Sequence, residues 1–192
     1  MQYKAIVIGV SLGGMNAMKV LFASLPSTFS IPIIIVQHIG ARSDNMWINF
    51  INTTSNLKLK EVREKEKVEL GNVYVAPANY HLLVEMDETF SLTIDQRVNF
   101  ARPSIDVLFE SAAAAYKDKL IGIILTGSNK DGAAGVKRIQ EYGGLVVVED
   151  PETAESNTMP LAAIATTKPD HILPLKKIVD LLIQLEQNNL AS

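Results

Sequence analysis

The order of apolar segments along the 192-residue chain is the feature that most limits its fold. Short, β-branched runs of strand length alternate with segments whose apolar residues recur every three or four positions, which is typical of amphipathic helices. The chain opens as strand, helix, strand, helix, at residues 5–8, 13–25, 31–36 and 44–51. Continuous apolar strands separated by helices predict a parallel sheet that is covered on both faces.

The alternation is interrupted in the middle of the chain and then resumes. Four short strand patterns follow one another at 57–62, 72–75, 81–85 and 90–93, and they predict a hairpin or meander attached to the sheet. The later elements expected are a helix at 104–116, a strand at 120–125, a helix at 133–142, a strand at 145–148, a helix at 160–165, a strand at 171–173 and a helix at 175–187. We therefore predict an α/β fold: a doubly wound, mostly parallel sheet with helices on both faces and a small antiparallel hairpin region, in a single domain over residues 1–192.

Composition excludes several classes of function. The chain has no cysteine, which removes disulfides, thiolate metal sites and cysteine nucleophiles. Its net charge of −3 argues against binding to nucleic acid. No apolar run is long enough for a membrane span, and the N-terminal run is a buried strand rather than a signal peptide, so we expect a cytoplasmic protein. No group of His, Asp and Glu has the spacing of metal ligands, and no metal is expected.

The loop after the first strand, residues 9–14, fits two motifs. A dinucleotide fingerprint needs a glycine where Ser11 stands and an acidic residue at the end of the second strand, which ends instead in Gln37 and His38. The other motif is G-x-S-x-G, a serine exposed on a tight strand-to-helix turn. The helix behind such a turn offers free N–H groups to a developing oxyanion. A plain role for Ser11 as a helix N-cap remains open.

Two further residues favour a catalytic interpretation. His38 follows the second strand, and because the carboxyl ends of parallel strands share one edge, we expect it within reach of Ser11, which needs a base to become nucleophilic. Asp131 follows the strand at 120–125 and can orient the imidazole, although capping of the helix at 133–142 is an alternative. Together the three have the roles of a hydrolase triad. Their order, Ser, His, Asp, differs from that of α/β-hydrolases, whose acid precedes the histidine.

Other polar residues have simpler interpretations. We expect His81, at the start of a strand, and His171 to be structural. We expect Arg42 and Arg102 to be solvated on the surface, although both could contact an acidic partner helix. Asp106 lies in the first turn of a predicted helix, where a carboxylate is favourable.

Motifs along nearly the whole chain, in the correct order, resemble the catalytic domain of the chemotaxis-type protein-glutamate methylesterase family. They lie at residues 8–14, 37–38, 75–77, 81–83, 102–109, 125–133 and 159–160. The resemblance implies a parallel-sheet α/β fold and hydrolysis of methyl esters on receptor glutamates, often with deamidation of receptor glutamines. It places the nucleophile, base and orienting acid on Ser11, His38 and Asp131, and it implies oxyanion donors at the backbone amides of Leu12 and Ser128.

The chain departs from the family pattern at three points. Leu12 stands where the family commonly has threonine, and Ser128-Asn129 stand where it commonly has Met-Gly, which bears on substrate fit and rate. Many relatives also carry an N-terminal phosphoacceptor domain, whereas this chain starts on the first catalytic strand, so we do not expect phosphorylation control within it.

The expected partners are methylated chemoreceptor helices and a separate or fused regulatory domain, and no cofactor is expected. The alternative is a non-catalytic signalling module that keeps the fold and binds a receptor. A nucleotide-binding protein ranks third.

Overall fold

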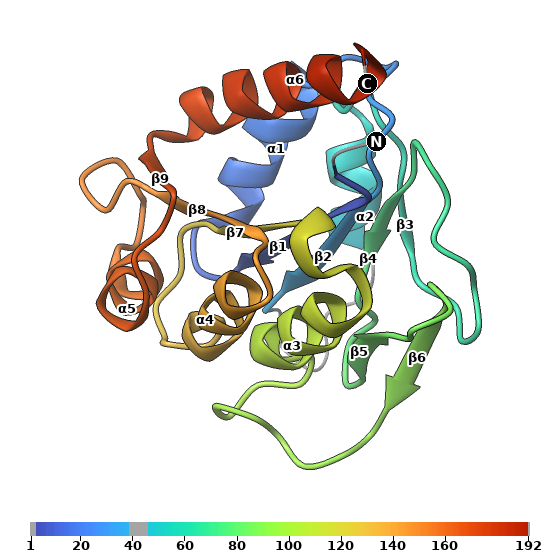
Figure 1. Ribbon diagram of the computed structural model, residues 1–192, viewed down its shortest axis with the longest axis vertical. Coiled ribbons are helices and arrows are strands. Elements are labelled where there is room, and N and C mark those ends of the chain that lie inside the picture. The colour runs from blue at the N-terminus through green and yellow to red at the C-terminus, as the bar shows by residue number, and fades with distance from the viewer. Residues whose placement is uncertain (1–2, 39–45, 192) are drawn as a thin grey trace.

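The computed structural model describes residues 3–38 and 46–191, and its centre is a seven-stranded sheet (Figure 1). Every pairing in this sheet is parallel, and the strand order is β3-β4-β2-β1-β7-β8-β9. The strands are β1 (Ala5–Val10), β2 (Ile33–Gln37), β3 (Leu59–Glu61), β4 (Val73–Val75), β7 (Leu120–Ile124), β8 (Leu145–Glu149) and β9 (His171–Leu173). The parallel sheet predicted from the alternation of elements is confirmed.

Helices cover both faces of the sheet, as predicted (Figure 1). One face packs against α1 (Gly14–Ser24), α2 (Met46–Asn52) and α6 (Leu175–Ala191). The other packs against α3 (Ile105–Tyr116), α4 (Ala133–Glu141) and α5 (Thr158–Thr166), with a short 3-10 helix, η1 (Lys117–Lys119), after α3. Alternate residues of each strand supply the two cores, since successive side chains point to opposite faces: Ile6 and Ile8 lie in the first core, Ala5 and Val7 in the second.

The prediction for residues 57–93 was only partly right. The strands expected at 57–62 and 72–75 do not form a hairpin: they are β3 and β4, which pair in parallel at one end of the main sheet. Proximity in sequence favours antiparallel pairing, but the loop between them returns the chain to the same end of the sheet. The antiparallel hairpin consists of β5 (His81–Val84) and β6 (Phe90–Thr93) alone, and its buried side chains join the core beneath α3.

The direction in which the strand order is built reverses between β1 and β7. Strands β2, β4 and β3 lie on one side of β1, and β7, β8 and β9 lie on the other. In open α/β sheets, a crevice forms outside the carboxyl ends of the strands at such a switch point.

The first two residues of the predicted helix 44–51 lie outside the described residues, and the rest of it is α2. No helix in the described part of the chain is both long and apolar enough to cross a membrane.

Candidate active site

Ser11 and His38 leave the sheet side by side at the switch point. In the register of β1 and β2, Val10 pairs with Gln37, so the residue after each follows at the same height. The His38 N–H donates to the carbonyl of Val10 at 3.0 Å, and the Ser11 N–H donates to the carbonyl of Thr126 at 3.0 Å. The shared sheet edge expected from the sequence therefore brings the loops after β1, β2 and β7 together.

Two glycines give the Ser11 turn its shape and its room: Gly13 within the turn and Gly127 opposite it. The residue that caps α1 is Gly13, in the left-handed region at φ 82°, so the alternative interpretation of Ser11 as the N-cap is wrong. Across the site, a Cβ on Gly127 would lie 2.4 Å from Met159 Cε and 3.0 Å from Ser11 Cβ, so only glycine fits there without a shift. The serine hydroxyl is thus presented on a turn that needs no help from its side chain.

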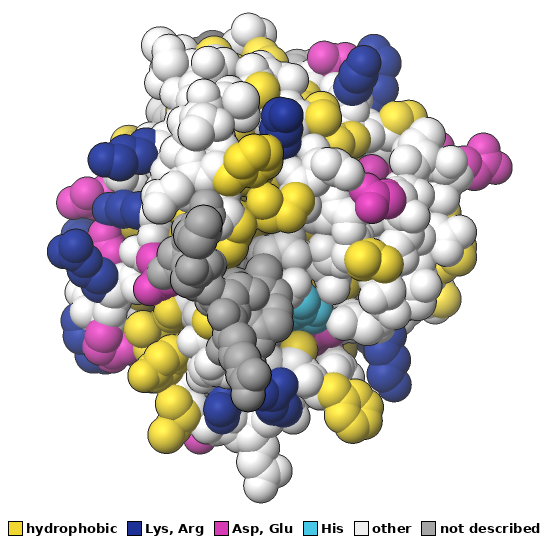
Figure 2. Space-filling model, turned by 180° about the vertical axis from the view of Figure 1, so that it is seen from behind, with side chains coloured by type: hydrophobic (Ala, Val, Ile, Leu, Met, Phe, Trp, Pro, Cys, Tyr) yellow, Lys and Arg dark blue, Asp and Glu magenta, His cyan; other side chains and the backbone are white. Residues whose placement is uncertain are grey.

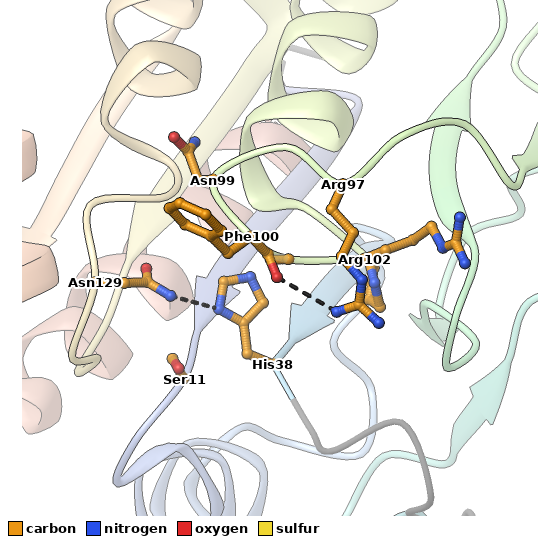
Figure 3. A pocket seen from close by; sticks show the side chains of 9 residues that line it. Ser11, His38, Arg97, Asn99, Phe100, Arg102 and Asn129 are labelled. Carbon is orange, nitrogen blue, oxygen red and sulfur yellow. Dashed lines mark hydrogen bonds between the residues drawn. The ribbon is translucent and has the colours of Figure 1, made fainter.

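His38 is bound firmly to Asp131. The distance from His38 Nε2 to Asp131 Oδ2 is 2.9 Å, and the carboxylate is completely buried. An ionised carboxylate only accepts hydrogen bonds, so Nε2 carries the proton in this contact. Among the described residues, no hydrogen bond joins Ser11 Oγ to His38, although both side chains line one pocket (Figure 3).

The Asp131 carboxylate also receives hydrogen bonds at the N-terminus of α3. Its donors there are the Ile105 N–H at 2.6 Å, the Ser104 hydroxyl at 2.8 Å and the Asp106 N–H at 3.3 Å. The expected alternative, capping of the helix that follows Asp131, is wrong: Gly132 caps α4, and Asp131 satisfies the free N–H groups of α3 instead. The helix expected at 133–142 does form as α4, but the helix that Asp131 caps is α3, which local sequence could not indicate because α3 begins 26 residues before Asp131.

These contacts set the charge of the buried carboxylate. Burial by itself raises the pKa of the Asp131 carboxyl, but hydrogen bonds from His38, Asn99, Ile105 N–H and Ser104 outweigh it. The resulting pKa lies below the usual value for aspartate, because each donor stabilises the charged form. Asp131 is therefore held as an anion beside the imidazole.

Asn99 links Asp131 to a second buried carboxylate and was not found from the sequence. Its Nδ2 donates to Asp131 Oδ1 at 3.0 Å and to Asp106 Oδ2 at 2.7 Å. Burial, opposed by the Gly135 N–H and supported by the charge of Asp131, raises the pKa of Asp106 to about 6. Asn99 lies in an irregular loop without periodicity, so no sequence signal pointed to it.

Asn129 occupies the other nitrogen of the imidazole. Its Nδ2 lies 3.1 Å from His38 Nδ1, and its Oδ1 accepts the Asp131 N–H at 3.0 Å (Figure 3). In the sequence, Asn129 stands out only as a departure from the family pattern. Its position beside the base depends on the fold of the loop after β7.

The pocket lies at the carboxyl edge of the sheet, and its lining comes from the segments that follow β1, β2 and β7 and from the loop before α3. Its lining consists of Ser11, His38, Arg97, Asn99, Phe100, Ala101, Arg102, Pro103 and Asn129. Phe100 is 95% exposed and stands on the wall of the pocket. From behind, a histidine is visible in a hollow of the surface, with cationic and apolar side chains near its rim (Figure 2).

Arg102 does not fit its predicted role as a solvated surface residue. Its Nη1 donates to the carbonyls of Ile94 at 2.6 Å and Asp95 at 3.0 Å, so the side chain braces the loop that forms the pocket wall. Arg97 lies beside it, with Nη1 3.4 Å from the Phe100 carbonyl. Arg42 lies outside the described residues.

Of the two remaining histidines, His81 is structural, as expected, and the structural role of His171 stays a prediction. His81 is buried; its Nε2 lies 3.0 Å from the carbonyl of Gln96, and its Nδ1 accepts the Ser104 N–H at 3.2 Å. His171 belongs to the edge strand β9, paired with Val147. Neither lines the pocket.

The two predicted oxyanion donors flank the site. The backbone N–H groups of Leu12 and Ser128 have no acceptor among the described residues, and neither residue lines the pocket with its side chain. Their role stays a prediction. Within residues 3–38 and 46–191, no group of three or more His, Cys, Asp or Glu is arranged to hold a metal ion.

The fold and the site define a class: an α/β protein with a hydroxyl, an imidazole and a buried carboxylate at the carboxyl edge of a parallel sheet. The family model described as CheB methylesterase matches residues 6–182, and the chain belongs to that family. The chain is also similar to a solved structure, the CheB methylesterase catalytic domain of Thermotoga maritima. The TM-score is 0.91 at 36% identity, covering 96% of this chain and all of the other.

Two curated relatives differ in length. A Leptospira interrogans protein is 60% identical over 190 residues, which are 99% of this chain and 98% of the relative. Its name presents protein-glutamate methylesterase and protein-glutamine glutaminase activity as predicted. The protein-glutamate methylesterase/protein-glutamine glutaminase of Thermotoga maritima is 37% identical over 185 residues, which are 95% of this chain but only 54% of that protein.

Proposed function

We propose that this protein hydrolyses methyl esters of glutamate side chains in chemoreceptors, with Ser11 as nucleophile, His38 as base and Asp131 as orienting acid. The observation that carries the proposal is the 2.9 Å contact between His38 Nε2 and the buried carboxylate of Asp131, in a pocket that Ser11 also lines. Family membership and the names of the relatives support the same reaction.

The first half of the reaction forms an acyl-enzyme. The Ser11 hydroxyl gives its proton to Nδ1 of His38, because Nε2 already carries the proton bound to Asp131. The Oγ–C bond forms, the carbonyl becomes an oxyanion, and the C–O bond to the methyl group's oxygen then breaks. Methanol leaves with the proton that His38 held, and Asp131 stabilises the transient imidazolium.

The second half releases the receptor glutamate. Water gives a proton to Nδ1 of His38 and attacks the acyl carbon, and Ser11 leaves with that proton. A receptor glutamine reacts by the same steps, with ammonia leaving in place of methanol. The amides of Leu12 and Ser128 serve as oxyanion donors, and their lack of an acceptor among the described residues supports this role.

Residues 1–192 act as one catalytic domain, and its partners are the cytoplasmic helices of methylated receptors. The near-complete match to the Leptospira interrogans relative supports a domain of this extent. Regulation by a separate or fused domain and action in the cytoplasm belong to the same proposal.

The second candidate is a non-catalytic module that keeps the fold and binds receptors. One observation favours it: Asn129 occupies the nitrogen that Ser11 needs. The intact His38–Asp131 contact opposes it.

The test is methanol release from methylated receptor fragments by the wild type and by Ser11→Ala. We expect release by the wild type and a loss of at least roughly a thousandfold in the variant, since it lacks the nucleophile. Circular dichroism should show the variant folded. Equal rates in the two proteins would refute the serine mechanism, and binding without release by the wild type would favour the non-catalytic module.

A further inference from the structure

One hydrogen bond in the pocket blocks the first proton transfer of the proposed reaction. The base must accept a proton at His38 Nδ1, yet Asn129 Nδ2 lies 3.1 Å from that atom. The lone pair that should receive the Ser11 proton is already engaged. No hydrogen bond from Ser11 Oγ competes for it among the described residues.

The orientation of the Asn129 carboxamide follows from its second contact. A backbone N–H can only donate, so the atom facing the Asp131 N–H at 3.0 Å is the carbonyl oxygen Oδ1. The atom facing His38 is therefore the NH₂ group, a donor. His38 Nε2 therefore carries the proton and donates it to the Asp131 carboxylate, and His38 Nδ1 accepts a hydrogen bond from the Asn129 NH₂ group.

This arrangement stabilises the resting base but not the state that the reaction must reach. Once His38 takes the serine proton, both ring nitrogens carry hydrogen, and the Asn129 NH₂ would face another donor. A donor that faces a donor has lost its hydrogen bond, and the cost rises in a partly buried site. The carboxamide must therefore leave Nδ1 before proton transfer.

We propose that Asn129 is a latch: its NH₂ group holds Nδ1 of His38 in the free enzyme, and Ser11 becomes nucleophilic when the carboxamide turns away. The proposal rests on the proposed function. Asn129 lines the same pocket as Ser11, so a carbonyl group of a bound substrate is an alternative acceptor for its N–H. Substrate binding thereby draws the Asn129 carboxamide away from His38. Small reactive esters that make no receptor contacts are therefore hydrolysed slowly.

A covalent probe separates the latch from receptor binding. A fluorophosphonate reacts with the activated serine: the Oγ–P bond forms, the P–F bond breaks, fluoride leaves, and the Ser11 proton passes to His38 Nδ1. The labelling rate is measured for the wild type, Asn129→Ala, Asn129→Ser and Asn129→Asp, with Ser11→Ala as the blank. Lys130→Ala, an exposed neighbour in the same loop, is the matched control.

Removing the latch should accelerate labelling. We expect Asn129→Ala and Asn129→Ser to react roughly three to ten times faster than the wild type, the range that one net hydrogen bond represents. The serine variant can still accept the Asp131 N–H, so it preserves the loop while freeing Nδ1. Lys130→Ala should match the wild type.

The isosteric variant Asn129→Asp should change the rate in the opposite direction. A carboxylate at this position accepts from Nδ1–H and favours the doubly protonated ring, which cannot take the serine proton. Labelling at neutral pH should slow at least roughly tenfold and recover as the pH is raised.

The outcomes distinguish the latch from the proposed function. If the wild type is labelled at Ser11 but the alanine and serine variants are equally fast or slower, the latch is refuted and the serine mechanism stands. If no protein in the series is labelled, both fail. If the aspartate variant is as fast as the alanine variant, hydrogen-bond polarity has no role and the latch is again refuted.

Discussion

At the scale of single residues, Asp131 performs two tasks that the sequence presented as alternatives. One oxygen is shared between the imidazole of His38 and the Ile105 N–H, and the other accepts from Ser104 and Asn99. A carboxylate offers enough lone pairs for this number of donors. The same group therefore orients the base and completes the N-terminus of a helix.

Asp131→Asn should cost stability as well as activity. The amide cannot accept at both oxygens, so at least one buried donor at the N-terminus of α3 loses its acceptor. We expect the free energy of unfolding to fall by about 2–4 kcal/mol, together with methanol release. Urea denaturation measures the first effect.

Ser11→Ala is the control for that experiment. It removes the nucleophile without touching a buried hydrogen bond, so its unfolding free energy should stay within about 0.5 kcal/mol of the wild type. If Asp131→Asn were as stable as Ser11→Ala, the capping role of the carboxylate would be wrong.

At the scale of elements, the N-terminus of α3 organises the site. Asp131 binds its first N–H groups from outside, and Asp106 in its first turn accepts the Gly135 N–H of α4 at 2.7 Å. Carboxylates are favourable at a helix N-terminus, but two of them in one buried place compete for ionisation. The pKa values diverge accordingly, that of Asp131 below its usual value and that of Asp106 at about 6.

The raised pKa of Asp106 predicts a pH dependence of stability. Between its unfolded value near 4 and its folded value of about 6, the folded protein binds more protons than the unfolded chain, so stability falls as pH rises. From pH 4.5 to pH 7 the loss due to Asp106 is about 2 kcal/mol. Asp131, whose folded pKa is lowered, is ionised in the folded state throughout this window and adds only a small slope of opposite sign at its acid end, where the unfolded carboxyl is still partly protonated.

Asp106→Asn should remove this slope. Urea denaturation of the wild type and the variant at pH 4.5 and 7 gives the difference, in which groups common to both proteins cancel. A variant that loses as much stability as the wild type over this interval would show that Asp106 is ionised throughout.

At the scale of the whole molecule, we expect the proposed contact with a receptor at the face around the pocket. The pocket wall carries an almost fully exposed aromatic ring, Phe100, beside the guanidinium groups of Arg97 and Arg102. Exposed aromatic residues at the centre of an interface commonly contribute much of the binding energy.

Phe100→Ala should weaken receptor binding and leave the chemistry intact. We expect KM for a methylated receptor fragment to rise about five- to thirtyfold with little change in kcat, since a hot-spot side chain contributes about 1–2 kcal/mol. Labelling of Ser11 by a small fluorophosphonate should not change.

Leu190→Ala is the matched control, because Leu190 is 70% exposed and follows Asn189, which binds Tyr3 at the opposite end of β1. If both variants raised KM alike, Phe100 would have no special role in the interface.

Most of the fold could be predicted from local patterns. Apolar periodicity located the strands and helices within a few residues, for example β6 at Phe90–Thr93, because burial on one face or both leaves a repeat in the sequence. The site's principal members followed from one further rule, that parallel strands end at a common edge. That rule brought together the loops of Ser11, His38 and Asp131.

Tertiary structure alone decided the rest. The parallel direction of β3, the capping of α3 by Asp131, and the positions of Asn99 and Asn129 depend on contacts between segments distant in sequence. Such contacts leave no periodic signal, since a single polar side chain in an irregular loop is compatible with many arrangements. The sequence by itself determined the alternating elements and the sheet edge where the polar residues gather. The tertiary structure determined which donor faces which acceptor there, because hydrogen-bond geometry is set only when the loops are packed together.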